Sequence, residues 1–335
     1  MTVLYVTERE ACLKIKHQQF QVYHNSELQL SIPVNRISHI VLFGSCRLTH
    51  GAMSLALRRQ IPVMFLSYQG RYFGRLQGKI AEIDYLQQQV KNSLNPEFRL
   101  RQAKSIVAGK ILNERTWLQR WYRSNKLPKP QLAETIEKLA LWREKVKEVE
   151  SIEVLLGYEG QASRLYFQAL GSFLLEPFTL TKRTRRPPTD PVNSLLSLGY
   201  TLLFQQIHTL IQAVGLHPHF GNLHTPRPNH PALVSDLMEE FRTPIVDSLV
   251  TYLVNSQIFH LEDFTSPDER GGVYLQPKAL KTYLHHWQEK LHNQVTHPYT
   301  GVKVTNLRCF ELQVWEYIAC VIGESEVYRP MLWKK

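Results

Sequence analysis

The chain has 335 residues, with 40 lysines and arginines against 29 aspartates and glutamates, and a formal net charge of +11. This length allows two domains, and the excess of positive charge favours a polyanionic partner such as nucleic acid. No apolar run reaches the ~18 residues that a membrane-spanning helix needs. The first ten residues lack the basic segment of a signal peptide. We therefore expect a cytoplasmic protein with no membrane partner.

The four cysteines are far apart in the sequence and have no paired metal-ligand spacing: Cys12, Cys46, Cys309 and Cys320. This distribution argues against a structural zinc site and against a disulfide framework. It predicts reduced, buried thiols.

Residues 1 to about 85 have the pattern of a β-rich domain. A short helix interrupts the strands: Thr49 can cap it, and Leu55 and Ala56 lie on its apolar face. Runs of β-forming residues are separated by polar or turn-forming residues. The predicted strands are Thr2–Val6, Cys12–Lys16, Phe20–Tyr23, Leu28–Ile32, Ile37–Phe43, Pro62–Leu66 and Arg71–Leu76.

Beyond this region the apolar residues recur at helical spacing. The sequence therefore predicts an α+β chain: a small, β-sandwich-like N-terminal domain over residues 1–85 and a larger all-α domain over residues 86–335, connected near residues 77–95. The predicted helical segments are Ile83–Leu94, Pro96–Arg123, Pro130–Lys147, Ser151–Leu174, Val192–Val214, Ala232–Asn255, Gln276–Leu291 and Leu307–Ile322.

Glu159 lies on the predicted helix that begins near Ser151. A single helical glutamate is usually solvated, but Gly157 and Gly160 flank this one. Each glycine costs a helix roughly 1 kcal/mol relative to alanine, so two of them indicate a close approach by backbone or ligand.

Two further motifs follow in the helical region. Gly-Asn-Leu-His ends at His224, although spacing alone leaves His217 and His219 as alternatives. Asp236 and Glu239 are three residues apart on a predicted helix and share one face, from which Glu240 turns away. Two adjacent carboxylates on an apolar helix are unfavourable unless a cation lies between them; a solvated helix edge is the alternative.

A loop after residue 175 is strongly basic. It holds Lys182, Arg183, Arg185 and Arg186 within five positions. On so basic a chain we expect these side chains to contact phosphates, although a merely solvated loop would have the same composition.

The candidate carboxylates and one imidazole together predict a divalent-metal site. Oxygen ligands with a single histidine suit Mg²⁺ or Mn²⁺ better than zinc. Arg242 can pair with a carboxylate or contact a phosphate, and Arg164 is a further phosphate-binding candidate. Tyr166 and Tyr200 are either buried core residues or contacts for DNA ends.

At these motifs the sequence resembles the CRISPR-associated endonuclease family, whose members are the integrase subunit of the spacer-acquisition complex. The resemblance covers nearly the whole chain, and the shared order of the motifs makes it specific. The matching segments are residues 157–167, 191–200, 221–224, 236–242 and 271–275, with Tyr328-Arg329-Pro330 near the end.

The resemblance implies that Glu159, His224 and Glu239 bind the metal, with Asp236 beside them. It implies an enzyme that inserts short foreign DNA at CRISPR repeats, by attack of a 3′-hydroxyl on a phosphodiester. It also implies a homodimer formed through the β-domain and a second Cas protein as partner. The alternative is a non-catalytic, basic nucleic-acid scaffold; an enzyme acting on small phosphoesters would explain the basic loop poorly.

The β-domain is thin, with little room for its own core. We therefore expect Ile40, Leu42, Val63 and Phe65 to be partly shared with a neighbouring subunit or with the helical domain.

Overall fold

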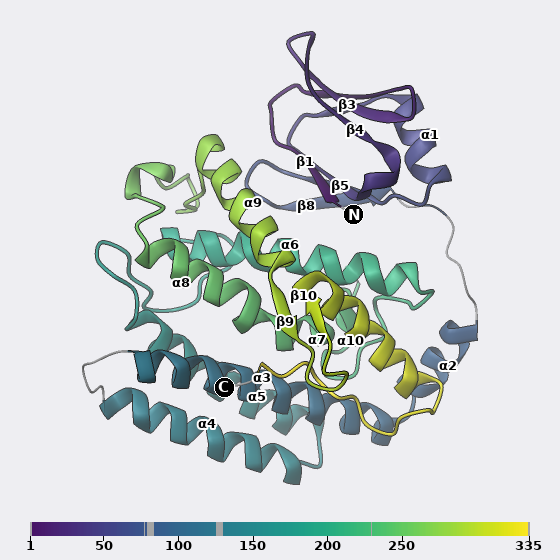
Figure 1. Ribbon diagram of the computed structural model, residues 1–335. Helices are drawn as coiled ribbons and strands as arrows, with labels where there is room; N and C mark the ends of the chain where they lie inside the picture. Colours follow the sequence, from purple (N-terminus) through teal and green to yellow (C-terminus); the bar gives the residue numbers. More distant parts are fainter. Residues whose placement is uncertain (1, 77, 79–83, 125–129, 229, 334–335) are drawn as a thin grey trace. The chain divides into compact units, whose positions relative to one another are not determined.

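The computed structural model describes residues 2–76, 78, 84–124, 130–228 and 230–333. The chain forms two compact units (Figure 1): unit 1 comprises Met1–Ile80 and Leu275–Leu284, and unit 2 comprises Ala81–Tyr274 and His285–Lys335. The sequence predicted two contiguous domains, with residues 275–284 in the helical one, whereas these residues group with the N-terminal unit. Residues 77 and 79–83 of the expected connection lie outside the described residues. Strands in sheets precede a mostly helical region, so the predicted α+β class is confirmed.

Unit 1 contains the predicted strands and one more. β6 was not expected, because its two residues are too few to give a periodic signal. The strands are β1 (Thr2–Val6), β2 (Cys12–Lys16), β3 (Gln19–His24), β4 (Glu27–Pro33), β5 (Ile37–Phe43), β6 (Arg47–Leu48), β7 (Val63–Leu66) and β8 (Tyr72–Leu76).

These strands form two four-stranded sheets, ordered β1-β5-β7-β8 and β4-β3-β2-β6. In the first sheet, β5 runs parallel to both neighbours, with Val6 opposite Leu42 and Leu42 opposite Phe65. A strand that is paired on both sides and buried on both faces is typically a continuous apolar run, and residues 40–43 of β5 (Ile-Val-Leu-Phe) have this pattern. In the second sheet, β2, β3 and β4 form an antiparallel meander.

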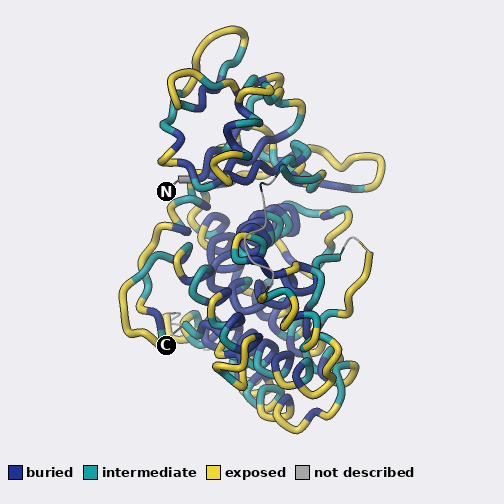
Figure 2. The backbone as a smooth tube through the Cα atoms, turned by 90° about the vertical axis from the view of Figure 1, so that its right-hand side faces the viewer, coloured by how far each residue is buried: buried dark blue, intermediate teal, exposed yellow. Residues whose placement is uncertain are grey.

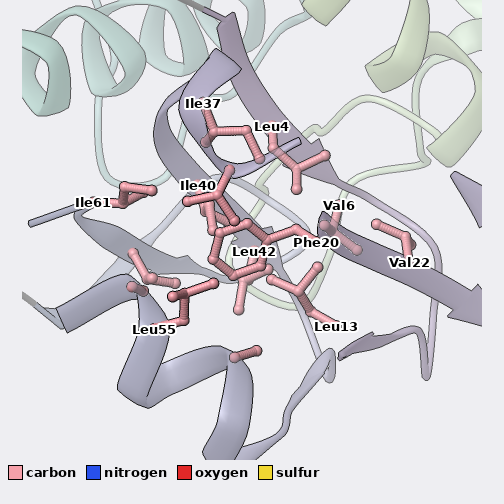
Figure 3. Close-up of a cluster of buried hydrophobic side chains, with 14 of the residues drawn as sticks. Leu4, Val6, Leu13, Phe20, Val22, Ile37, Ile40, Leu42, Leu55 and Ile61 are labelled. Atoms are coloured by element: carbon pink, nitrogen blue, oxygen red, sulfur yellow. The ribbon is translucent and has the colours of Figure 1, made fainter. Parts of the chain in front are cut away.

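Unit 1 has its own hydrophobic core (Figure 3). Ile40, Leu42 and Val63 are at most 1% exposed and pack with residues from both sheets and from α1 (His50–Arg58), and Phe65 packs against the same cluster. The expectation of little room for a core was therefore wrong, because residues of both sheets and of α1 form one cluster. The sharing of these residues with a neighbouring subunit or with the helical domain stays a prediction. The cap at Thr49 is confirmed: its hydroxyl accepts the Ala52 N–H at 3.4 Å.

Unit 2 is mostly helical, and its interior is formed by the central helices (Figure 2). The long helix α3 packs against α4, α5 and α7, and α6 packs against α7 and α10. The helices are α2 (Asp84–Ser93), α3 (Pro96–Ser124), α4 (Pro130–Glu148), α5 (Ile152–Gly171), α6 (Pro191–Ala213), α7 (Ala232–Phe241), α8 (Ser248–Asn255), α9 (Pro277–His292, which begins in unit 1) and α10 (Asn306–Val321).

Two features of unit 2 differ from the expected all-helical pattern. The segment Ala232–Asn255 is not one regular α-helix, because Arg242–Asp247 is π-helical. Pro244 has no N–H to donate, which accounts for an irregular ladder here. A short hairpin, β9 (Gln294–Thr296) and β10 (Lys303–Thr305), follows α9, and its strands are too short for a sequence signal.

Across the part of the chain that the structure describes, no helix combines the length and apolarity needed to span a bilayer. All four cysteines are free thiols; Cys309 and Cys320 are buried, whereas Cys12 and Cys46 are only partly so.

Candidate metal centre

Three helices of unit 2 bring two carboxylates to one lysine. The Lys110 Nζ on α3 contacts Glu159 Oε1 on α5 and lies 2.8 Å from Glu239 Oε2 on α7. The Ser163 hydroxyl, one turn along α5, donates to Glu159 Oε1 at 3.1 Å. Glu239 is almost fully buried and Glu159 is 21% exposed, so one side of the cluster is open to solvent.

The cluster is held together by charge. Burial alone would raise the pKa of Glu239, but the charges of Arg242 and Lys110 overcome it and lower the pKa to about 2. The same carboxylates raise the pKa of Lys110, although burial opposes this. Arg242 Nε lies 3.0 Å from Glu239 Oε2. Glu239 is therefore ionised at neutral pH and available as an anionic ligand.

Asp236 fixes the position of His224. Its carboxylate accepts the backbone N–H groups of Asn222, Leu223 and His224 at 2.5, 3.0 and 3.1 Å, and it lies 2.7 Å from His224 Nδ1. A carboxylate is an acceptor, so Nδ1 carries the proton and Nε2 is left with a lone pair. Asp236 is thus occupied in orienting the imidazole, a position in which carboxylates commonly support metal-binding histidines.

The loop before His224 needs a glycine. A Cβ at Gly221 would lie within 2.8 Å of atoms of Ala232 and Asp236, so any larger residue would push the loop off α7. His224 is the candidate histidine that contacts Asp236. The rings of His217 and His219 instead lie 5.3 Å from each other.

The two helix glycines beside Glu159 have a different environment. Apart from the neighbouring backbone of α5 itself, no atom of the described residues comes within 4 Å of a Cβ built at Gly157 or Gly160, and both residues are exposed. Close packing by the protein's own backbone therefore does not explain them.

A buried tyrosine–aspartate group adjoins Arg242. Asp247 accepts the hydroxyls of Tyr166 and Tyr200 at 2.8 and 2.5 Å, and Arg242 lies over the Tyr200 ring, 4.8 Å from its centroid. Arg183 also lies over this ring, at 5.3 Å. Tyr166 is fully buried, so it is a core residue.

The predicted phosphate-binding residues separate into two groups. Arg183 is turned inward, onto Tyr200 and the Asn193 side chain, whereas Lys182, Arg185 and Arg186 are exposed. Arg164 on α5 is also exposed. Arg242 pairs with Glu239, which is one of the two readings that the sequence left open.

Sequence reasoning missed the contributions of α3. Lys110 and Glu114, one turn apart, are both buried in the cluster, and burial raises the pKa of Glu114 to about 8. In the sequence, these two charged residues lie on the same predicted helix face as the apolar Val107 and Ile111, and this pattern could have indicated that they are buried. Glu240 does turn away, as predicted: it accepts the Tyr328 hydroxyl at 2.7 Å.

The donor set fits a hard divalent cation. Within the described residues, no three His, Cys, Asp or Glu side chains are already spaced to hold an ion. However, both carboxylates converge on one positive charge, the Lys110 ammonium, and His224 lies close enough to lower the pKa of Glu239. Two carboxylate groups and one imidazole Nε2 match the ligand preference of Mg²⁺ or Mn²⁺.

One protein-family model matches most of the chain. Residues 4–289 match the family model described as CRISPR associated protein Cas1. The chain belongs to the Cas1 family. The match includes the α3, α5 and α7 residues of the candidate centre, and it confirms the resemblance found from the motifs.

Two curated relatives match the chain over nearly their whole length. The chain is 33% identical over 333 residues to CRISPR-associated endonuclease Cas1 3 of Thermus thermophilus, covering 98% of this chain and 96% of the relative. It is 30% identical to CRISPR-associated endonuclease Cas1 1 of Moorella thermoacetica, covering 100% and 99%.

Solved Cas1 structures share the fold. A Cas6-RT-Cas1–Cas2 complex matches with a TM-score of 0.85 at 26% identity over 100% of this chain, which spans 36% of that much longer chain. A CAS1 protein from Thermotoga maritima matches with a TM-score of 0.83 at 23% identity, over 100% of this chain and 99% of that one.

Proposed function

We propose that the protein is the divalent-metal-dependent endonuclease and integrase of CRISPR adaptation. Its substrates would be a short double-stranded DNA fragment and a CRISPR repeat. The 3′-hydroxyl of the fragment would attack a phosphodiester at the repeat boundary, forming one P–O bond as another breaks. Family membership and the endonuclease names of its relatives support the class of reaction.

The observation that carries the proposal is the convergence of Glu159 and Glu239 on Lys110, with His224 held beside them by Asp236. Burying several charged groups together costs desolvation free energy, so such a cluster is more often found at a functional site than in an ordinary core. Glu159, Glu239 and His224 Nε2 would hold Mg²⁺ or Mn²⁺. When bound, the ion would supply Lewis-acid polarisation of a phosphoryl oxygen.

The chain's own side chains have distinct roles in this proposal. Asp236 holds the imidazole through Nδ1, which would leave Nε2 free to bind the ion. Arg242 keeps Glu239 ionised. The exposed cations Lys182 and Arg185, together with Arg186 and Arg164, would neutralise phosphates along the DNA. Arg183 and Tyr200 would shape the wall beside the centre rather than reach the duplex.

Two protein partners belong to the proposal. One structural neighbour is a Cas6-RT-Cas1–Cas2 complex, in which a Cas1-containing chain is assembled with Cas2, and this supports a second Cas protein as partner. A homodimer would provide two centres, one for each 3′ end of a DNA fragment. Light scattering on the purified chain tests the dimer: a monomer of about 39 kDa, the mass of one chain, would contradict it.

The test of the chemistry is a strand-transfer assay with a labelled DNA fragment, a repeat-containing plasmid and Mg²⁺ or Mn²⁺. Glu159→Ala, His224→Ala and Glu239→Ala should each abolish nicking and integration and leave most DNA binding intact. Glu153→Ala is the matched control, because Glu153 is exposed on the same helix. Asp236→Ala should lose activity to an equal or smaller extent.

The outcome that contradicts the centre is full activity of the Glu159 and Glu239 variants with metal present. If the wild type binds DNA but shows no strand transfer, the alternative of a non-catalytic scaffold is favoured.

A further inference from the structure

A segment of unit 2 near the end of the chain, residues 328–333, has no regular secondary structure but is held along α3. We call it the C-terminal strap. Tyr328 and Met331 are each 1% exposed. Gln102 accepts the Tyr328 N–H at 2.7 Å, and Asn113 Nδ2 donates to the Met331 carbonyl at 2.8 Å. Gln102 and Asn113 lie about three helical turns apart, so the strap follows one face of α3.

The strap packs on α3 directly beside Lys110. A Cβ built at Gly109 would lie 2.5 Å from Cβ and Cγ of Pro330, so the proline ring fits only because residue 109 is a glycine. Glycine is less favourable than alanine inside a helix, and the close approach of Pro330 accounts for it here. One turn further along, Asn113 accepts the Trp333 N–H at 3.2 Å. The turn of α3 that carries Lys110 is therefore held by the strap.

The same strap holds α7 beside Glu239. The Glu240 carboxylate accepts the Tyr328 hydroxyl and the Met331 N–H, each at 2.7 Å. The Glu240 carbonyl accepts Asn113 Nδ2 at 2.9 Å. Consecutive residues of an α-helix point about 100° apart, so a rotation of α7 that moved Glu239 would also break the contacts of Glu240. These contacts therefore fix the direction in which Glu239 leaves the helix.

We propose that the C-terminal strap is a positioning element of the candidate metal centre. It holds α3 at Gly109 and α7 at Glu240. It thereby sets the contact between Lys110 Nζ and Glu239 Oε2, 2.8 Å in this structure, and the position of one proposed ligand. α7 continues into the π-helical segment Arg242–Asp247, where irregular hydrogen bonding defines the rotation of the helix less strictly. The consequence for metal affinity rests on the proposed function.

The first experiment is calorimetric titration of the full-length chain with Mn²⁺. Gly109→Ala puts a methyl group against the Pro330 ring and should push the strap off α3. We expect the Kd for Mn²⁺ to rise about tenfold, the lower end of what residues that support metal ligands contribute. Adding Pro330→Gly to Gly109→Ala removes the clash and should bring the Kd back to that of Pro330→Gly alone. Val327→Ala, a change at an exposed residue just before the strap, is the control and should bind normally.

This titration separates positioning from simple stabilisation. A strap that only stabilised the fold would lower the urea midpoint of Gly109→Ala but leave the Kd of the folded protein unchanged. An unchanged Kd in Gly109→Ala therefore overturns the proposal. So does a combined variant that binds as weakly as Gly109→Ala although Pro330→Gly alone binds like the wild type.

The second experiment needs no metal. In EDTA, urea unfolding gives the stability lost by Lys110→Met in the wild type and in Tyr328→Phe, which removes only the hydroxyl that Glu240 accepts. If the strap sets the contact between Lys110 and Glu239, that contact is already weakened in Tyr328→Phe, and Lys110→Met should cost less there. Additive losses would overturn the proposal, because the effects of independent sites add.

The two experiments also distinguish this inference from the proposed function. If the wild type binds no Mn²⁺ but the losses are non-additive, the strap positions the charged contact while the proposed metal centre fails. If the wild type binds Mn²⁺ and carries out strand transfer while neither experiment shows an effect, the proposed function stands and the positioning role is refuted.

Discussion

Replacing Lys110 with methionine tests the central contact of the candidate centre. The change keeps most of the apolar stem and removes the ammonium that contacts Glu159 and Glu239. Removing one partner of a buried ion pair typically costs ~3–5 kcal/mol. Here Arg242 still pairs with Glu239, and Glu159 is 21% exposed, so we expect the lower end, about 3 kcal/mol.

Urea unfolding followed by tryptophan fluorescence measures this loss. All six tryptophans lie between residues 117 and 333, outside Leu275–Leu284, so the signal reports on unit 2 alone. In EDTA, Lys110→Met should unfold at lower urea than the wild type. Lys138→Met, which breaks only an exposed pair on α4, should lose less than about 1 kcal/mol.

Metal should narrow the difference in stability between the two proteins. In the wild type an incoming cation must displace the Lys110 ammonium, whereas in Lys110→Met that competitor is gone and only Arg242 still pairs with Glu239. Saturation at about 100 times the Kd adds about 2.7 kcal/mol of stability. We therefore expect Mn²⁺ to stabilise the variant more than the wild type. Equal stability in EDTA would refute the ion-pair argument, and an equal or smaller gain from Mn²⁺ would refute the competition.

Three further predictions follow from the same geometry. Asp236→Asn should lower metal affinity about 10- to 100-fold in calorimetry, because the imidazole loses its anionic support. Burial lowers the pKa of His224, but Asp236 more than offsets this and raises it. The stability that this pair adds is therefore fully present below about pH 6.5 and is lost as the pH rises through the raised pKa. Metal binding needs the neutral ring, so metal affinity should increase over the same pH range. Unfolding experiments and Mn²⁺ titrations at several pH values check the two trends. Neutralising Lys182, Arg185 and Arg186 should make the log–log salt slope of duplex binding shallower by ~0.9 per lost contact, and an unchanged slope would show a merely solvated loop.

Local signals in the sequence determined most of the longer helices and strands of this protein. Alternating β-formers mark the strands of unit 1, Thr49 marks the start of α1, and helical spacing marks the long helices. Each of these features depends on residues that are close together in the sequence, within one strand or within one or two turns of a helix. The three motifs with Glu159, His224 and Asp236–Arg242 likewise carry enough local identity to indicate the family, which the family model confirms.

Only the tertiary structure decided what these residues touch. Lys110 is 49 positions from Glu159, and no periodicity relates them. Likewise, Asp236 supports His224 because a loop fits α7 at Gly221, and Arg183 turns inward because Tyr200 offers a ring. The physical reason is that burial and charge pairing depend on contacts between helices or strands that are distant in sequence. The spacing of residues along the chain carries information only about the helix or strand in which they lie.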